Sequence, residues 1–300
     1  MKLYSEESCM GDKGSAQRTT DEMLREIERQ KELLEEKDRE IEELKKHSFE
    51  RFYDIMSRLE KYTTEEVLFY TAQILSEVMD SKDVAIYTVV NRDYARLFSA
   101  TSSEARQLGN SLKYTAMGNL YNDLQSGRVY MNKDMEAGRP VMASAIYAEE
   151  EIRVILMFWG IPCQRLTETE GNRLAVTEAL IQNAVLRASR YMASFRSKRY
   201  LEGTNVLNEE AFTVLVKTFF GAKAKGLTEC TMLEIEMGYH EYKSISIQVA
   251  NHIRQTDYMG VMEGGTLYIL LCNTDPENAK VVQERLQKLG YESKMKEIAG

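Results

Sequence analysis

The 300-residue sequence predicts a mixed α/β protein in which an N-terminal coiled-coil helix precedes two domains that each combine helices with a β-sheet. Three observations support this prediction. Apolar residues recur at heptad-like spacing within residues 20–58, residues 59–195 show a helix, several strands and a long closing helix, and residues 200–300 alternate helices with strands. Residues 1–19 show no apolar period, and we expect them to be disordered.

Composition limits the classes of protein and ligand. The net charge of -8 and the pI near 5.3 argue against a surface that binds nucleic acid or an anionic membrane. An anionic ligand must therefore meet a local cluster of arginines. The four cysteines form no CxxC pair, and the three histidines lack ligand spacing for zinc, so we expect a reducing, cytoplasmic setting and neither a metal nor another cofactor. The longest apolar run, residues 154–161, is too short to span a bilayer.

The segment 20–58 is predicted to be a long helix that pairs with a second copy. Its charged core contains no glycine or proline, and its apolar residues are spaced by three, four and seven: Met23, Ile27, Leu34, Ile41 and Leu44. This spacing is typical of a two-stranded coiled coil, and it predicts a homodimer. The alternative is a single solvated helix, which would be marginally stable without a partner.

Residues 59–195 have the element order of a GAF or PAS sensor domain. A capping box of Thr63 and Glu66 predicts the start of an amphipathic helix, and a second box, Thr167 with Glu170, predicts the start of the closing helix. Between these helices we expect a short helix near residues 117–125 and strands over 84–90, 95–100, 129–131, 141–147 and 152–159. We therefore interpret this segment as GAF-like.

The polar segment 196–203 marks a second boundary. After it the sequence predicts a helix over residues 209–220, a strand over 231–236 and a second helix over 243–253. A hairpin over 258–271 and a last helix over 276–289 follow. Such an α/β domain with an antiparallel hairpin is of the nucleotidyl-cyclase kind.

The stretch from Ile253 to Leu286 carries the most chemical information: it contains Arg254-Gln255-Thr256-Asp257, then a turn with Gly264-Gly265, then Arg285. This order resembles the second half of a GGDEF domain. In that family an RxxD motif ends a helix, a GG[DE]EF hairpin follows, and a further helix holds another arginine. Here the motif runs from Arg254 to Asp257, the hairpin turn reads EGGTL, and the further arginine is Arg285. The resemblance implies that these three residues form the family's product-inhibition site, whose ligand is cyclic-di-GMP.

The residue types suit that ligand. The Hoogsteen edge of guanine presents two acceptors that the fork of Arg254 can meet, while Asp257 can accept from the N–H groups of the Watson–Crick edge. Arg285 can face a phosphate or a second guanine. Alternatively, Arg254 and Asp257 form an exposed ion pair that contributes little. Because the three side chains are expected at a helix end and on an outer helix face, their replacement should change stability little.

The catalytic half of the pattern is lost, and we predict that the protein is not an enzyme. A cyclase needs acidic metal ligands on the first strand and in the signature turn. The strand keeps Glu234 and Glu236, but the turn has Thr266 and Leu267 in place of the acidic pair. The stretch that carries a substrate-binding lysine and asparagine in the family is also missing around residues 237–243. A residual diguanylate cyclase is the alternative.

A GAF-like domain followed by a short, degenerate GGDEF-like domain with an intact RxxD motif resembles the PelD family of cytoplasmic receptors. The resemblance implies that cyclic-di-GMP binding activates exopolysaccharide synthesis, with a glycosyltransferase and membrane components as partners. Proteobacterial members carry membrane helices where this chain has a coiled coil, so attachment to a membrane would depend on those partners. The alternative is a sensor whose GAF-like domain binds another ligand; Cys163 is interpreted as an inert loop cysteine.

Overall fold

The computed structural model describes residues 10–62, 64–236, 242–262 and 264–297. The chain divides into two compact units, Met1–Ser57 and Arg58–Gly300. The described part of the first unit is helical, and the second unit contains a six-stranded and a five-stranded sheet with their helices. The predicted mixed α/β fold is confirmed. Within the described residues, no helix combines the length and the apolar character that a membrane span requires.

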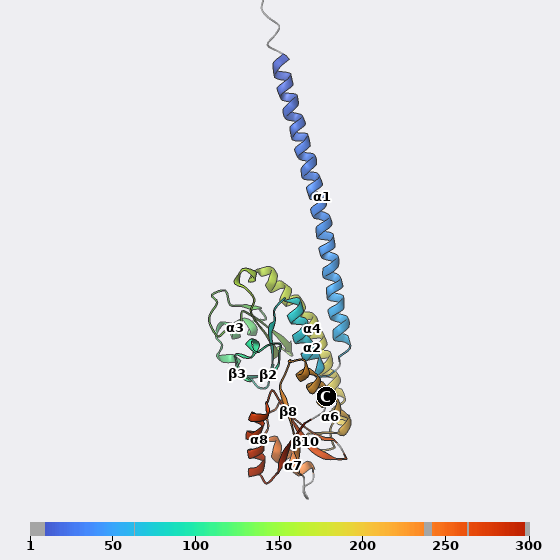
Figure 1. Cartoon of the computed structure of the whole chain (residues 1–300), viewed down its shortest axis with the longest axis vertical. Helices are drawn as coiled ribbons and strands as arrows, with labels where there is room; N and C mark the ends of the chain where they lie inside the picture. The colour runs from blue at the N-terminus through green and yellow to red at the C-terminus, as the bar shows by residue number, and fades with distance from the viewer. Residues whose placement is uncertain (1–9, 63, 237–241, 263, 298–300) are drawn as a thin grey trace, which may run out of the picture. The chain divides into compact units, whose positions relative to one another are not determined.

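Helix α1 (Met10–Glu60) begins earlier than the sequence predicts (Figure 1). Residues 1–9 lie outside the described part of the chain, but the expectation of disorder is wrong for residues 10–19. Starting a helix costs more than extending one, and residues 15–18 are of types that tolerate a helix. The strongly helical segment that follows can therefore extend toward the N-terminus.

The predicted seam of α1 is exposed where its side chains are described. Met23, Ile27 and Leu34 expose 62%, 61% and 64% of their surface in the single chain, and the side chains of Ile41 and Leu44 lie outside the described ones. A row of apolar residues this exposed is the surface that a second helix would cover in a coiled coil.

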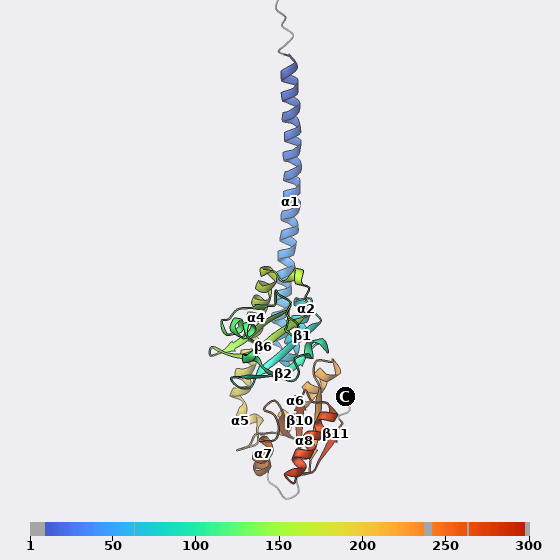
Figure 2. The same cartoon turned by 90° about the vertical axis from the view of Figure 1, so that its left-hand side faces the viewer.

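The first sheet follows the predicted succession of strands. All neighbouring strands are antiparallel, in the order β3-β2-β1-β6-β5-β4, and β2, β1 and β6 lie side by side in Figure 2. The strands are β1 (Asp83–Val89), β2 (Tyr94–Ala100), β3 (Ser111–Lys113), β4 (Tyr130–Met131), β5 (Met142–Ala148) and β6 (Glu151–Trp159). Only β3 was not predicted.

The helices of the first sheet are α2 (Glu66–Val78), α3 (Asn119–Gln125) and α4 (Glu168–Ser194). The hydroxyl of Thr167 accepts from the N–H of Glu170 at 3.3 Å, which confirms the predicted cap of α4. In contrast, α2 has no side-chain cap, and Thr63 lies outside the described residues. The carboxylate of Glu66 accepts instead from the hydroxyl of Thr218 at 2.9 Å.

The second sheet has the order β11-β8-β10-β9-β7. Its strands are β7 (Val206–Leu207), β8 (Cys230–Ile235), β9 (Tyr258–Met262), β10 (Thr266–Cys272) and β11 (Ser293–Lys296), and the helices of this region are α5 (Arg196–Arg199), α6 (Glu209–Ala224), α7 (Tyr242–Ala250) and α8 (Pro276–Lys288). Helix α8 packs beside β11 (Figure 2). The predicted helices, strand and hairpin are present, and the elements that were missed have only two to four residues.

A shared aromatic core joins the two sheets. Phe69 of α2 lies 4.6 Å from Phe98 of β2 and 5.1 Å from Phe219 of α6, and Phe98 lies 5.7 Å from Phe219, measured between ring centroids. All three side chains are buried. Because each buried aromatic contributes roughly 1.5–3 kcal/mol, the two sheets are stabilised against separation.

Candidate functional site

The RxxD motif forms a tight turn between α7 and β9. Helix α7 ends at Ala250, so the motif lies beyond the helix and not in its last turn, as the sequence had suggested. The backbone N–H of Asp257 donates to the carbonyl of Arg254 at 3.0 Å, and the backbone N–H of Arg254 donates to Oδ2 of Asp257 at 2.8 Å. Backbone and side chain together thus close the turn.

The second carboxylate oxygen of Asp257 ties this turn to the sheet. Its Oδ1 accepts from the backbone N–H of Cys272, the last residue of β10, at 3.0 Å. Burial raises the pKa of Asp257 to about 6, although the two backbone hydrogen bonds and the positive charges of Arg254 and Arg96 act to lower it. Asp257 therefore has a structural role that the sequence did not reveal, and its replacement should affect stability.

The guanidinium of Arg254 is held by the loop that follows β10. Its Nη1 donates to Oγ1 of Thr274 at 3.3 Å. The hydroxyl of Thr274 donates in turn to the carbonyl of Cys272 at 3.0 Å, and the Thr274 carbonyl accepts from the hydroxyl of Thr231 at 2.8 Å. The rest of the Arg254 side chain is exposed, so its free N–H groups can reach a ligand.

Helix α8 brings Arg285 close to the RxxD turn and Thr274. The helix begins after Asp275, whose Oδ1 accepts from the backbone N–H of Asn278 at 2.8 Å, and this hydrogen bond holds the pKa of Asp275 below its usual value. Asn278, Val281, Val282 and Arg285 are spaced by three or four residues and share one helix face. Val281 is 46% exposed, which leaves an apolar surface beside the arginine.

These elements surround a cavity of about 210 Å³. It is lined by His252, Ile253, Arg254, Asp257, Thr274, Asn278, Val281, Val282 and Arg285. The structure therefore brings together all three residues that the sequence predicted. The other lining residues were not predicted as part of the site. The sequence did contain one signal for them, because Asn278, Val281 and Val282 precede Arg285 at intervals of three and four residues.

The cavity combines cationic, acidic and apolar surface. Two arginines can donate paired hydrogen bonds to phosphate or to the acceptors of a base, and one carboxylate can accept from base N–H groups. The two valines offer an apolar contact for the face of a ring. The arrangement suits an anionic ligand that carries a guanine base.

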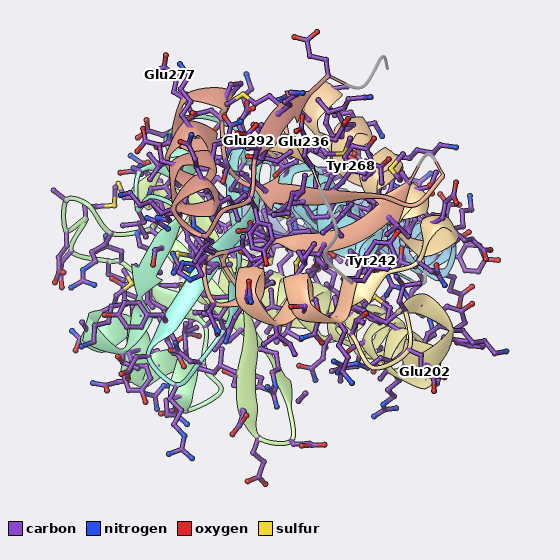
Figure 3. The ribbon with its side chains drawn as sticks, turned by 90° about the horizontal axis from the view of Figure 1, so that it is seen from below. Glu202, Glu236, Tyr242, Tyr268, Glu277 and Glu292 are labelled. Atoms are coloured by element: carbon purple, nitrogen blue, oxygen red, sulfur yellow. The ribbon has the colours of Figure 1, made fainter. Side chains whose placement is uncertain are left out.

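Glu234 of β8 and Glu236, the residue directly after β8, are each paired with a lysine of β11. Glu234 accepts from Lys296 at 3.4 Å and from the hydroxyl of Tyr268 at 3.4 Å, and Glu236 pairs with Lys294. The backbone N–H of Glu236 also donates to the carbonyl of Glu292, and Figure 3 shows Glu236 and Glu292 as neighbours. Both carboxylates therefore have a lysine partner in partly exposed ion pairs.

The signature turn offers no acidic group at the positions described. Thr266 pairs with Met262 across the hairpin, and Leu267 is fully buried in the core. Gly264 and Gly265 adopt φ values of 79° and 96°, and Glu263 lies outside the described residues. Among the residues that the structure describes, no group of three histidine, cysteine or acidic side chains is arranged to hold a metal ion.

No protein-family model and no curated protein matches the chain. Solved structures that resemble it include two fragments of PelD from Pseudomonas aeruginosa. One shares 12% identity with a TM-score of 0.36 and covers 82% of this chain and 89% of the fragment. The other was solved in complex with c-di-GMP and shares 12% identity with a TM-score of 0.35, over 83% of this chain and 89% of the fragment.

A GAF domain from an Acinetobacter phosphoenolpyruvate-protein phosphotransferase is also similar. It shares 12% identity with a TM-score of 0.39, over 48% of this chain and 95% of that domain. At this distance the neighbours do not indicate which ligand this chain binds.

Proposed function

We propose that this protein is a cyclic-di-GMP receptor that binds the dinucleotide at the cavity between the RxxD turn and helix α8. The observation that carries the proposal is the meeting of Arg254, Asp257 and Arg285 around one cavity, although the first and last of them are 31 positions apart in the sequence. These are the residues that the GGDEF resemblance implies for ligand binding.

Each residue has a distinct role in the proposal. Arg254, oriented by Thr274, donates to the Hoogsteen edge of guanine. Asp257 keeps a lone pair on each oxygen beyond its backbone hydrogen bonds, and it accepts from the Watson–Crick edge. Arg285 donates to phosphate, for which the chain's overall charge of -8 gives no general attraction. Calorimetric titration of the full-length protein with cyclic-di-GMP tests the proposal directly.

The affinity should depend on pH through Asp257. Its pKa of about 6 means that it becomes protonated below that value and loses acceptor capacity, so the affinity should fall by up to tenfold per pH unit below about 6. Titrations from pH 5 to 8 of the parent and of Asp257→Asn test this dependence, because only the parent should lose affinity through the carboxyl.

The same group makes an opposite contribution to stability. Because its pKa in the folded protein, about 6, lies above the usual 3.8, the folded state binds more protons between these values. The stabilisation from this group is therefore fully present below about 3.8, and it is lost as pH rises through about 6. Urea unfolding of the parent and of Asp257→Asn at several pH values isolates this group: the stability of the parent relative to the variant should fall as pH rises through about 6, and a difference that does not change with pH would contradict the assignment.

We further propose that the protein does not make cyclic-di-GMP. Glu234 and Glu236 are paired with lysines, and Thr266 and Leu267 supply no carboxylate for a metal. Incubation with GTP and Mg²⁺ is expected to give no cyclic-di-GMP in a chromatographic assay. Product that disappears on Glu234→Ala would establish a residual cyclase instead.

The chain is also proposed to form a homodimer through α1. The exposed seam at Met23, Ile27 and Leu34 supports this arrangement. Deleting residues 21–46 should halve the mass measured by light scattering. A particle that still contains two chains after the deletion would remove the coiled coil from the account.

The downstream role that we propose is activation of Pel-like exopolysaccharide synthesis in the cytoplasm. Its partners would be the glycosyltransferase and membrane components of the synthase complex, which would also determine any attachment to the membrane. If the purified protein binds no cyclic-di-GMP, the GAF-like segment becomes the place to search for a different ligand.

A further inference from the structure

Asn273, which follows strand β10, is an unusual residue at the contact between the two sheets. Its φ of 47° lies in the left-handed region, which residues other than glycine and asparagine rarely adopt. The residue is only 5% exposed. A buried polar residue in this conformation must be held by its hydrogen bonds.

Those hydrogen bonds reach the first sheet. The side-chain Nδ2 donates to the carbonyls of Leu97 at 2.7 Å and Phe98 at 3.1 Å, both in β2. The Asn273 carbonyl accepts from Nδ2 of Asn110 at 2.8 Å, and Asn110 also accepts through its own carbonyl from the N–H of Leu97 at 3.2 Å. Asn273 is thus fastened to β2 and to the segment beside it.

The remaining side-chain oxygen completes the set. Oδ1 of Asn273 accepts from Nη1 of Arg106 and from the hydroxyl of Thr228, both at 3.3 Å. Burial lowers the pKa of Arg106, so this half-buried cation depends on the acceptors around it. Every polar atom of the Asn273 side chain therefore has a partner.

The two neighbours of Asn273 hold the candidate site. On one side the backbone N–H of Cys272 donates to Asp257, and on the other side the hydroxyl of Thr274 accepts from Arg254. The first turn of α8, which leads to Arg285, starts at Pro276. A shift of Asn273 would therefore move Cys272, which binds Asp257, and Thr274, which binds Arg254.

We propose that Asn273 is a positioning residue that locks the nucleotide site to strand β2, so that ligand bound at the site also stiffens the first sheet. This inference rests on the proposed function. Because coupling between two regions is reciprocal, a sheet that orders the site must itself be ordered when the site is filled. The first sheet then acts as part of the receptor and not only as its neighbour.

Asn273→Gly tests the lock, because glycine accepts the left-handed backbone while losing the side-chain hydrogen bonds. We expect cyclic-di-GMP to bind this variant about tenfold more weakly than the parent, as for a loss of about 1.4 kcal/mol. Asn110→Ala is a milder second variant, which removes one hydrogen bond to the Asn273 carbonyl and should reduce the affinity less. Thr218→Val is the matched control, because it breaks a contact between helix α6 and Glu66 of helix α2, away from the site.

Hydrogen exchange measured with and without cyclic-di-GMP provides the second readout. In the parent, ligand should slow exchange at the amides of Leu97 and Ala100 as well as in the RxxD turn. In Asn273→Gly the slowing should remain in the turn and disappear from β2, and Thr218→Val should behave like the parent. Parent-like affinity in Asn273→Gly, or ligand protection that never reaches β2, would overturn the lock. A parent protein that binds no cyclic-di-GMP would overturn the proposed function itself and this inference with it.

Discussion

Replacing Arg254 with alanine is expected to weaken cyclic-di-GMP binding by about one to two decades, and Arg285→Ala should have an effect of similar size. A bidentate contact from arginine to guanine contributes roughly 1–3 kcal/mol. Arg254 is exposed except for its hydrogen bond to Thr274, and Arg285 is exposed on α8, so neither supports the core. Calorimetric titration should show the lost affinity, while thermal unfolding without ligand should change little.

The two substitutions should differ in their effect on the preference for guanine over adenine. Arg254→Ala should reduce the preference for guanine over adenine dinucleotides, whereas Arg285→Ala should weaken both if it faces phosphate. Lys280→Ala is the matched control, because it removes a positive charge from the same helix without touching the cavity lining. A control that weakens binding as much as Arg285→Ala would show that only the general charge of α8 matters.

Asp257→Ala is expected to destabilise the free protein by about 1–3 kcal/mol and to relax the preference for guanine. The substitution leaves the buried N–H of Cys272 without its acceptor and opens the turn at Arg254. Ionising the carboxyl in this half-buried place costs free energy at neutral pH, which is why the loss should stay within this range. Urea unfolding followed by circular dichroism measures the effect.

Asp257→Asn separates the structural role from the recognition role. The amide keeps one oxygen that can accept from the N–H of Cys272, but its NH₂ group faces the N–H of Arg254 and opposes the N–H donors of guanine, so only part of the stability should return. Asp134→Ala, at an exposed position of the first half of the chain, controls for the loss of one negative charge. If Asp257→Asn recovered both stability and affinity, the carboxylate would have no role in reading the base.

Much of this fold was predictable, because its longer elements carry strong local signals. The capping box at Thr167, the apolar strand over residues 84–90 and the Asp-Pro start of α8 each specify their element within a few residues. The start of α1 was not predictable in the same way, since residues 10–19 have no apolar period of their own and are helical by extension from their neighbours. Strands as short as β7 and β11 show no period at all.

The candidate site was predictable in its three named residues but not in how they are supported. A motif gives the types and order of side chains, and so Arg254 and Asp257 could be singled out. That Asp257 also accepts from Cys272, or that Asn273 fastens the next loop to β2, depends on contacts between segments up to 176 positions apart. Such contacts leave no local pattern, so the sequence alone could not show that Asp257 also supports the fold.

The most direct test of the central claim is calorimetric titration of the full-length protein with cyclic-di-GMP, beside the Arg254→Ala/Arg285→Ala double variant and with cyclic-di-AMP as the ligand control. The account predicts saturable binding of cyclic-di-GMP by the parent, weaker binding of cyclic-di-AMP, and a loss of two decades or more in the double variant, on the order of the sum of two such contacts. No saturable heat with the parent, or equal affinity in the double variant, would contradict it.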